Sequence, residues 1–103
     1  MKDRPPPHLV SAARAVLGAL DAAGIPACLI GGMAIPRWGQ PRATTDADFS
    51  VLAPYGEETR VLDILLARFH PRRPDARAFA LDHRVLLLSA EGVGIDVALA
   101  AFP

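Results

Sequence analysis

Two aspartates separated by one residue are the part of the sequence best suited to chemistry. Asp46 and Asp48 open the segment 46–52, whose apolar residues predict a β-strand. Because side chains alternate across a sheet, both carboxylates should point to the same face, roughly 7 Å apart along the backbone. That arrangement suits chelation of a hard divalent cation, Mg²⁺ or Mn²⁺, with phosphate oxygens completing its coordination shell. Acidic pairs with this spacing also occur on solvated strand edges and in turns, where they bind nothing.

A third aspartate stands out because its neighbours are apolar. Asp96 lies between Ile95 and Val97 in a segment that predicts a strand. An acid within a core strand is costly unless it is paired, bound to metal or placed at the rim of the sheet. We therefore expect Asp96 to share one cleft with Asp46 and Asp48. An exposed edge strand is the alternative explanation for Asp96.

Two segments that precede the acidic pair could bind phosphate. Gly31 and Gly32 link a predicted strand to a short helix, so their backbone N–H groups and the helix N-terminus could approach an anion closely. Arg42 and Thr44 add a guanidinium and a hydroxyl, which suit phosphate oxygens. A tight turn without ligand, and a solvated loop in which Arg42 neutralises the acids, are the alternatives.

The elements that would position these residues follow from periodicity and turn signals. Helices are predicted at 8–23, at 33–38 and from Glu57 to His70, where Pro71 ends the last of them. Strands are predicted at 27–30, 46–52, 78–81, 85–88 and 95–99, with a basic loop at 72–77 and a turn at 91–94. The predicted fold is α/β, with one mixed β-sheet and helices packed on it.

Composition limits the class of protein. The 103 residues suit one domain, 1–103, with 1–7 as a flexible leader. Eleven basic and eleven acidic side chains cancel, so the whole chain has no net attraction for nucleic acid or an anionic membrane. Cys28 is the only cysteine, which excludes an intrachain disulfide. No apolar run is long enough to span a bilayer, so we expect a cytoplasmic protein that does not bind membranes.

The motifs together resemble a known signature. Gly31-Gly32, thirteen intervening residues, Asp46-Ala47-Asp48 and then Asp96 resemble the signature of the nucleotidyltransferase superfamily, whose fold is shared with the DNA polymerase β catalytic core. The fuller string, which adds Ile30, Met33-Ala34, Trp38-Gly39 and Pro41-Arg42-Ala43-Thr44, is similar to the AbiEii-like branch. That branch includes the toxin components of some toxin–antitoxin pairs. Family members usually carry a large aliphatic residue where this chain has Ala47.

The resemblance implies an enzyme that transfers a nucleoside monophosphate from a nucleoside triphosphate to a hydroxyl group and releases pyrophosphate. Asp46 and Asp48 would hold two Mg²⁺ ions, and Asp96 would bind the second ion and act as general base. The site would further use Gly31 and Gly32 to cradle the β- and γ-phosphates, and Arg42 and Thr44 to position phosphate. The acceptor could be RNA, a protein or a small molecule.

Other expectations concern partners. Family members continue beyond the third acid into helices, so we expect this chain to be weak or inactive alone and to cover an apolar surface as a homodimer. A catalytically silent nucleotidyltransferase-like binding module is one alternative. An unrelated small α/β interaction domain with an accidental acidic pair is the other. The basic residues at 68–77 could meet RNA, or could simply be a solvated helix end and loop.

Overall fold

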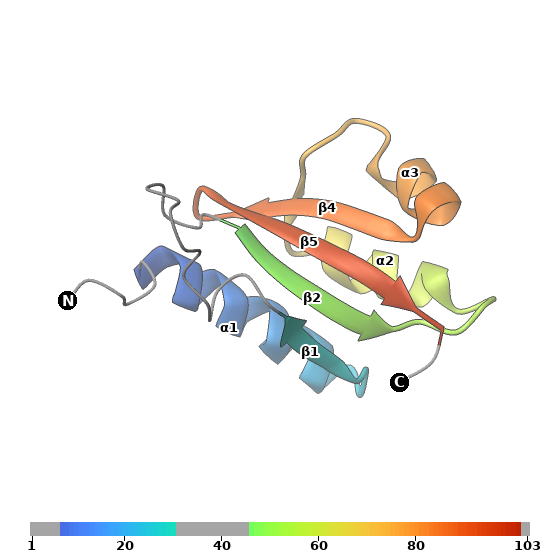
Figure 1. Cartoon of the computed structure of the whole chain (residues 1–103), viewed down its shortest axis with the longest axis horizontal. Helices are drawn as coiled ribbons and strands as arrows, with labels where there is room; N and C mark the ends of the chain where they lie inside the picture. The colour runs from blue at the N-terminus through green and yellow to red at the C-terminus, as the bar shows by residue number, and fades with distance from the viewer. Residues whose placement is uncertain (1–6, 31–45, 102–103) are drawn as a thin grey trace, which may run out of the picture.

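The computed structural model describes residues 7–30 and 46–101, which form one five-stranded mixed sheet and three helices (Figure 1). The elements are α1 (Pro7–Ala22), β1 (Ala27–Ile30), β2 (Asp46–Leu52), α2 (Glu58–Leu66), β3 (His70–Pro71), α3 (Ala76–His83), β4 (Val85–Ala90) and β5 (Val93–Ala100). The strand order is β1-β2-β5-β4-β3, with β2 and β5 parallel and the other neighbours antiparallel. The predicted α/β class is confirmed.

Helix α1 forms where the apolar period predicts it. Its buried side chains recur at helical spacing and include Leu9, Ala12, Val16 and Leu20. At its end Gly24 has φ 72°, and the N–H of the next residue donates to the Leu20 carbonyl at 2.9 Å. This is the left-handed glycine cap that satisfies the last carbonyls of a helix.

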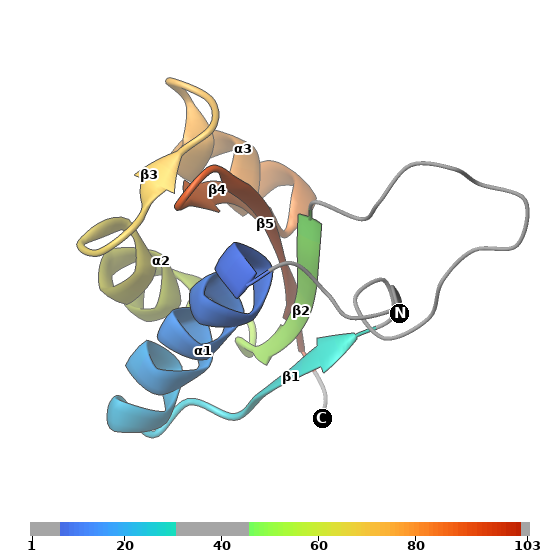
Figure 2. The same cartoon turned by 90° about the vertical axis from the view of Figure 1, so that its left-hand side faces the viewer.

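The hydrophobic core lies between the sheet and the two helices α1 and α2, which lie on the same side of it (Figure 2). In β2 and β5 the odd-numbered residues from Ala47 to Val51 and from Val93 to Leu99 are buried, and the even-numbered residues point to the other face. We call that second side of β1, β2, β5 and β4 the open face. Figure 1 views it from the front, and no described helix covers it there.

The helix predicted from Glu57 to His70 is too long. Helix α2 ends at Leu66, and His70–Pro71 instead forms the short strand β3, which pairs with Leu88 and Ser89 of β4. Pro71 is compatible with this position because β3 lies at the edge of the sheet, where a missing N–H loses no ladder bond. The helical spacing of apolar residues continues beyond the end of α2, because Phe69 packs on the core although it lies in the connection between α2 and β3.

The predicted strand at 78–81 is wrong, and so is the loop assignment for the end of 72–77. Residues Ala76–His83 form α3, with Ala76 and Ala80 buried one helical turn apart. Alanine has the highest helix propensity, and two alanines at i and i+4 share one helix face. The helix ends at Arg84, whose φ of 58° is left-handed although no glycine marks the position.

The turn between the last two strands is shorter than the predicted turn at 91–94. Ala90 pairs with Val93, so only Glu91 and Gly92 connect β4 to β5. Both have positive φ, 53° and 77°, as a two-residue type I′ hairpin turn requires. Both strands are accordingly longer than predicted.

Several predictions fall outside the described residues: residues 1–6 of the leader predicted at 1–7, the helix at 33–38, and the phosphate-binding residues Gly31, Gly32, Arg42 and Thr44. Pro7, the last residue of that predicted leader, instead begins α1. Within the ranges 7–30 and 46–101, no helix has the length and apolar character needed to cross a membrane.

Candidate active site

The parallel pairing of β2 with β5 brings the three predicted acids together. Asp48 pairs in register with Asp96, and Asp46 pairs with Gly94. Parallel neighbours in register point their side chains to the same face, with the strands about 4.8 Å apart. Asp46, Asp48 and Asp96 therefore share one end of the open face, as their spacing predicts. The edge-strand alternative for Asp96 is wrong, because β5 lies between β2 and β4.

The surroundings of the acids raise the pKa of Asp48. Partial burial of its carboxyl is the largest cause, and the negative charges of Asp96 and Asp46 add to it, together with a hydrogen bond between the Asp48 and Asp96 side chains. The cation of Arg72 acts in the opposite direction. Burial is explained by the neighbours in register, Ile30 on β1 beside Asp48 and Leu87 on β4 beside Asp96. Burial and the two neighbouring acids therefore outweigh the effect of the Arg72 cation on Asp48.

Arg72 reaches into this cluster from the segment that follows β3. Its Nη2 group donates to Oδ1 of Asp96 and, at 3.3 Å, to the carbonyl of Ile95. Its own backbone N–H donates to the Leu87 carbonyl at 2.9 Å, which anchors the residue beside β4. The sequence assigns Arg72 only to a basic loop. Its role in the cluster depends on the pairing of β3 with β4. Because β3 has only two residues, its sequence has no alternating pattern that could predict this pairing.

Gly94 is the second site residue that sequence reasoning missed. A Cβ atom added to Gly94 would collide with Oδ1 of Asp46 and would lie 2.9 Å from Nη1 of Arg72 and 3.1 Å from Cγ of Asp46. Separations below 3.0 Å would force the ends of these two side chains to move, so the missing side chain leaves the space that both groups use. The sequence signal was a glycine inside a strand, which often marks a close approach of other groups.

The donor set of the cluster fits a divalent metal ion. Three carboxylates from two adjacent strands offer the oxygen ligands that Mg²⁺ and Mn²⁺ prefer, and a cation would offset the charge that raises the pKa of Asp48. In the part of the chain that the structure describes, however, no three acidic, histidine or cysteine side chains are arranged around one ion position. Among the described residues, Arg72 is the cation that contacts Asp96.

A second arginine is prominent but lies at the other end of the strands. Arg84 donates to the carbonyls of Ala53 and Leu99 at 2.6 and 3.0 Å and forms an ion pair with Glu58 at 2.7 Å. Its guanidinium also lies over the Tyr55 ring, 4.4 Å from the centroid. These contacts join the end of β2, the start of α2 and the end of β5, so Arg84 stabilises the fold and does not belong to the acidic cluster.

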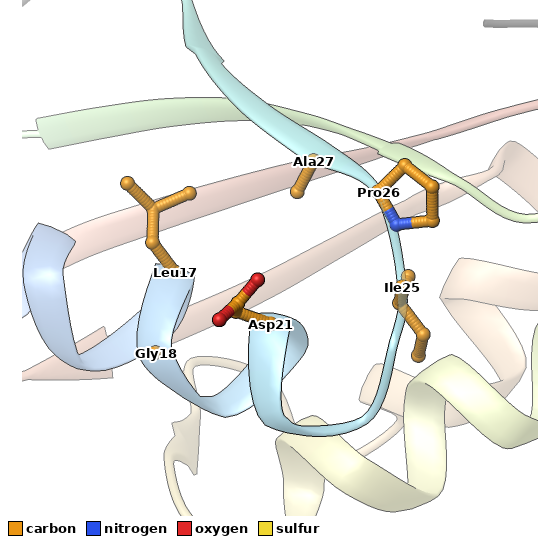
Figure 3. A pocket seen from close by; sticks show the side chains of 6 residues that line it. All are labelled: Leu17, Gly18, Asp21, Ile25, Pro26 and Ala27. Carbon is orange, nitrogen blue, oxygen red and sulfur yellow. The ribbon is translucent and has the colours of Figure 1, made fainter.

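An open hollow of about 440 Å³ lies between α1 and the start of β1 (Figure 3). Its lining residues are Leu17, Gly18, Asp21, Ile25, Pro26 and Ala27. Ala27 pairs with Val51, three residues along β2 from Asp48. Half of the lining residues belong to α1, so the hollow is on the helix side of the sheet. With one carboxylate and no other titratable group in its lining, it is a poorer candidate for catalysis than the three acids of the open face.

No protein-family model matches this chain, and no match is found among curated proteins or among solved structures. The resemblance to nucleotidyltransferases therefore remains a prediction. Function has to be inferred from the chemistry of the acidic cluster itself.

Proposed function

We propose that the acidic end of the open face is a nucleotidyltransferase site. The observation that carries the proposal is the register of β2 and β5, which puts Asp48 beside Asp96 and Asp46 two residues away on the same face. Three acids gathered on a partly buried strand pair repel one another, and a fold retains such an arrangement at a cost that cation binding would offset. The proposed reaction transfers a nucleoside monophosphate from a triphosphate to an acceptor hydroxyl.

In this proposal each acid has a distinct position. Asp46 and Asp48 are carboxylate ligands for Mg²⁺ or Mn²⁺, which when bound would neutralise phosphate charge and lower the pKa of the acceptor hydroxyl. Asp96 lies on the neighbouring strand, where it would bind the second ion and accept the proton of that hydroxyl as the general base. The exposed Ile30 on β1 and the half-buried Leu87 on β4 flank the Asp48–Asp96 pair.

The rest of the substrate site is proposed from the resemblance. Gly31 and Gly32 would bind the triphosphate through backbone N–H groups, and Arg42 and Thr44 would position its phosphates. Gly31 and Gly32 directly follow Ile30, whose Cα is paired with that of Asp48. A phosphate-binding segment that starts there begins next to the acids, which supports a shared substrate.

Titration calorimetry tests the proposal most directly. The full chain is titrated with Mn²⁺ and with Mn²⁺ plus a nucleoside triphosphate, alongside Asp46→Asn, Asp48→Asn and Asp96→Asn. We expect binding in the wild type and a loss of at least roughly tenfold in each variant, because an amide oxygen is a weaker ligand for a hard cation. Asp82→Asn, an exposed carboxylate on α3, is the matched control. Equal affinities in wild type and site variants would refute the proposed site.

A second candidate function is favoured by Arg72. A guanidinium already paired with Asp96 can satisfy that acid without metal, as in a catalytically silent binding module. The two candidates differ in one measurement, the incorporation of labelled nucleotide into RNA, protein and small-molecule acceptors. Binding of nucleotide without incorporation would support the silent module, and neither binding nor incorporation would support an unrelated interaction domain.

A further inference from the structure

We propose that Arg72 is a positioning residue whose guanidinium occupies the place of the divalent cation in the metal-free protein, and that Gly94 provides the space for it. That a metal ion replaces the Arg72 guanidinium at the acids rests on the proposed function. That the guanidinium lies beside the acids does not. The proposal concerns a basic residue that the acidic motif does not include.

The contacts of Arg72 identify it as the counter-charge of the cluster. Nη2 contacts the Asp96 carboxylate, and Nη1 lies beside the point above Gly94 where Oδ1 of Asp46 also lies. The guanidinium therefore contacts Asp96 on β5, and its charge also lowers the pKa of Asp48 on β2, against the effect of the other two acids. A planar group with several N–H donors is suited to holding two carboxylates in fixed positions.

The same contacts predict competition with a metal ion. A divalent cation bound by Asp96 would compete for Oδ1, the oxygen atom that Arg72 contacts, and the positive charge of Arg72 would repel it at this distance. Arg72 lies on a short connection, and its backbone N–H donates to the Leu87 carbonyl. Its side chain can therefore give up its contacts with Asp96 and the Ile95 carbonyl while its backbone stays in place. Arg72 and the metal ion are thus alternative partners of the same carboxylates.

Gly94 makes this arrangement possible because any side chain there would displace both groups. A Cβ atom would lie 2.9 Å from Nη1 of Arg72 and in collision with Oδ1 of Asp46. Gly94→Ala should therefore move Asp46 as well as Arg72, and lose metal binding. Arg72→Gln should remove only the competitor. The two variants act on the same cluster and are expected to change metal affinity in opposite directions.

The test measures binding of Mn²⁺ alone to the full chain, by the electron paramagnetic resonance signal of the free ion, at low ionic strength. We expect Arg72→Gln to raise Mn²⁺ affinity roughly two- to fivefold, the range given by loss of one partly exposed ion pair. Arg72→Lys keeps the charge and should return the affinity toward that of the wild type. Gly94→Ala should lower it. Arg73→Gln is the control, because Arg73 pairs with Asp75 at 2.7 Å, outside the cluster.

Thermal unfolding without metal tests the guanidinium independently. Arg72→Gln should lower the unfolding midpoint more than Arg73→Gln does, because it leaves three acids without their nearest cation. An Arg72→Gln variant that binds Mn²⁺ no more tightly than the wild type overturns the exchange, even if Asp48→Asn abolishes binding and the proposed function stands. A wild type that binds no Mn²⁺ overturns the proposed function and the exchange together. Equal midpoints for the two arginine variants overturn the role of Arg72 in the metal-free cluster.

Discussion

Asp48 and Asp96 are direct neighbours in register on the parallel strands β2 and β5. The negative charge of Asp96 disfavours the ionised form of Asp48, and the charge of Asp46 adds to this effect. The pKa of Asp48 is raised accordingly, with partial burial as the largest cause. This relationship leads to the first prediction.

Asp48→Asn should stabilise the metal-free protein at neutral pH. A raised pKa in the folded state means that the folded protein binds this proton more tightly than the unfolded chain. The free energy of unfolding therefore falls as the pH rises from the ordinary value of 3.8 through the raised pKa. The asparagine amide does not ionise, so Asp48→Asn avoids this fall in the free energy of unfolding. We expect a gain of roughly 2–4 °C in the unfolding midpoint at pH 7, measured by circular dichroism in the presence of a chelator.

The pH dependence provides the control for this prediction. Below pH 3.8 the carboxyl is protonated in both states of the wild type, so the advantage of Asp48→Asn should disappear there. Adding Mn²⁺ at pH 7 should reverse the order, because only the wild type gains a ligand-bound state. An Asp48→Asn variant that is less stable at pH 7 without metal would show that the carboxylate is not under repulsive strain.

Asp96→Asn should abolish nucleotide transfer more completely than it disturbs folding. The general base contributes roughly 10²- to 10⁴-fold to the rate of such reactions, and an amide cannot accept the proton. The measurement is incorporation of labelled nucleotide with Mg²⁺ or Mn²⁺. Ser50→Ala is the matched control, since Ser50 lies on the same face of β2, two residues beyond Asp48. Transfer by Asp96→Asn at the wild-type rate would exclude this residue as the base.

Arg84→Gln should destabilise the protein without changing Mn²⁺ affinity. The substitution leaves the carbonyls of Ala53 and Leu99 without their donor and separates β2 and β5 from α2. We expect the unfolding midpoint to fall by roughly 4–8 °C, the effect of about one net hydrogen bond in a domain of this size. Unchanged Mn²⁺ binding per folded molecule would confirm that Arg84 and the acidic cluster are independent.

Glu58, the ionic partner of Arg84, allows a pH control of the same contact. The pKa of Glu58 is lowered, first by its own backbone N–H and further by the Gly56 N–H and the Arg84 guanidinium. A lowered pKa gives stability that is present above the ordinary value of 4.5 and is lost as the pH falls through the folded pKa. Glu58→Gln should therefore be less stable than the wild type at pH 7 and match it in acid. A difference that persists unchanged in acid would contradict an ionic contribution.

Ala47→Leu should be destabilising. Ala47 is fully buried in the core between the two acids and pairs with the equally buried Ile95. Three extra carbon atoms in a filled core cost about 1–3 kcal/mol through forced shifts of neighbouring groups. Chemical denaturation measures this, with Ala78→Leu on the exposed side of α3 as the control. A stable Ala47→Leu variant would indicate unfilled space beneath the acids.

The sequence by itself determined the elements whose burial pattern is local. The apolar period of α1 and the alternation in β2 depend only on which face of one helix or strand meets the core. For the same reason, Asp46 and Asp48 at i and i+2 had to share a face. The misassigned segments are those where local signals conflict. In α3 the alanines and Phe79 fit helix or strand, and the helix ends at Arg84 without the usual glycine.

Tertiary structure decided which groups meet the acids. Asp96 could be recognised from its apolar neighbours, but only the parallel register of β2 and β5 places it beside Asp48 rather than one residue away on the opposite face. Arg72 lies 24 residues before Asp96 and reaches it because β3 adds to the edge of β4, a pairing of two residues with no periodicity of its own. The space above Gly94 exists only where β2, β5 and this arginine converge. Contacts between segments far apart in the chain depend on strand register, which is set by the packing of the whole sheet against its helices.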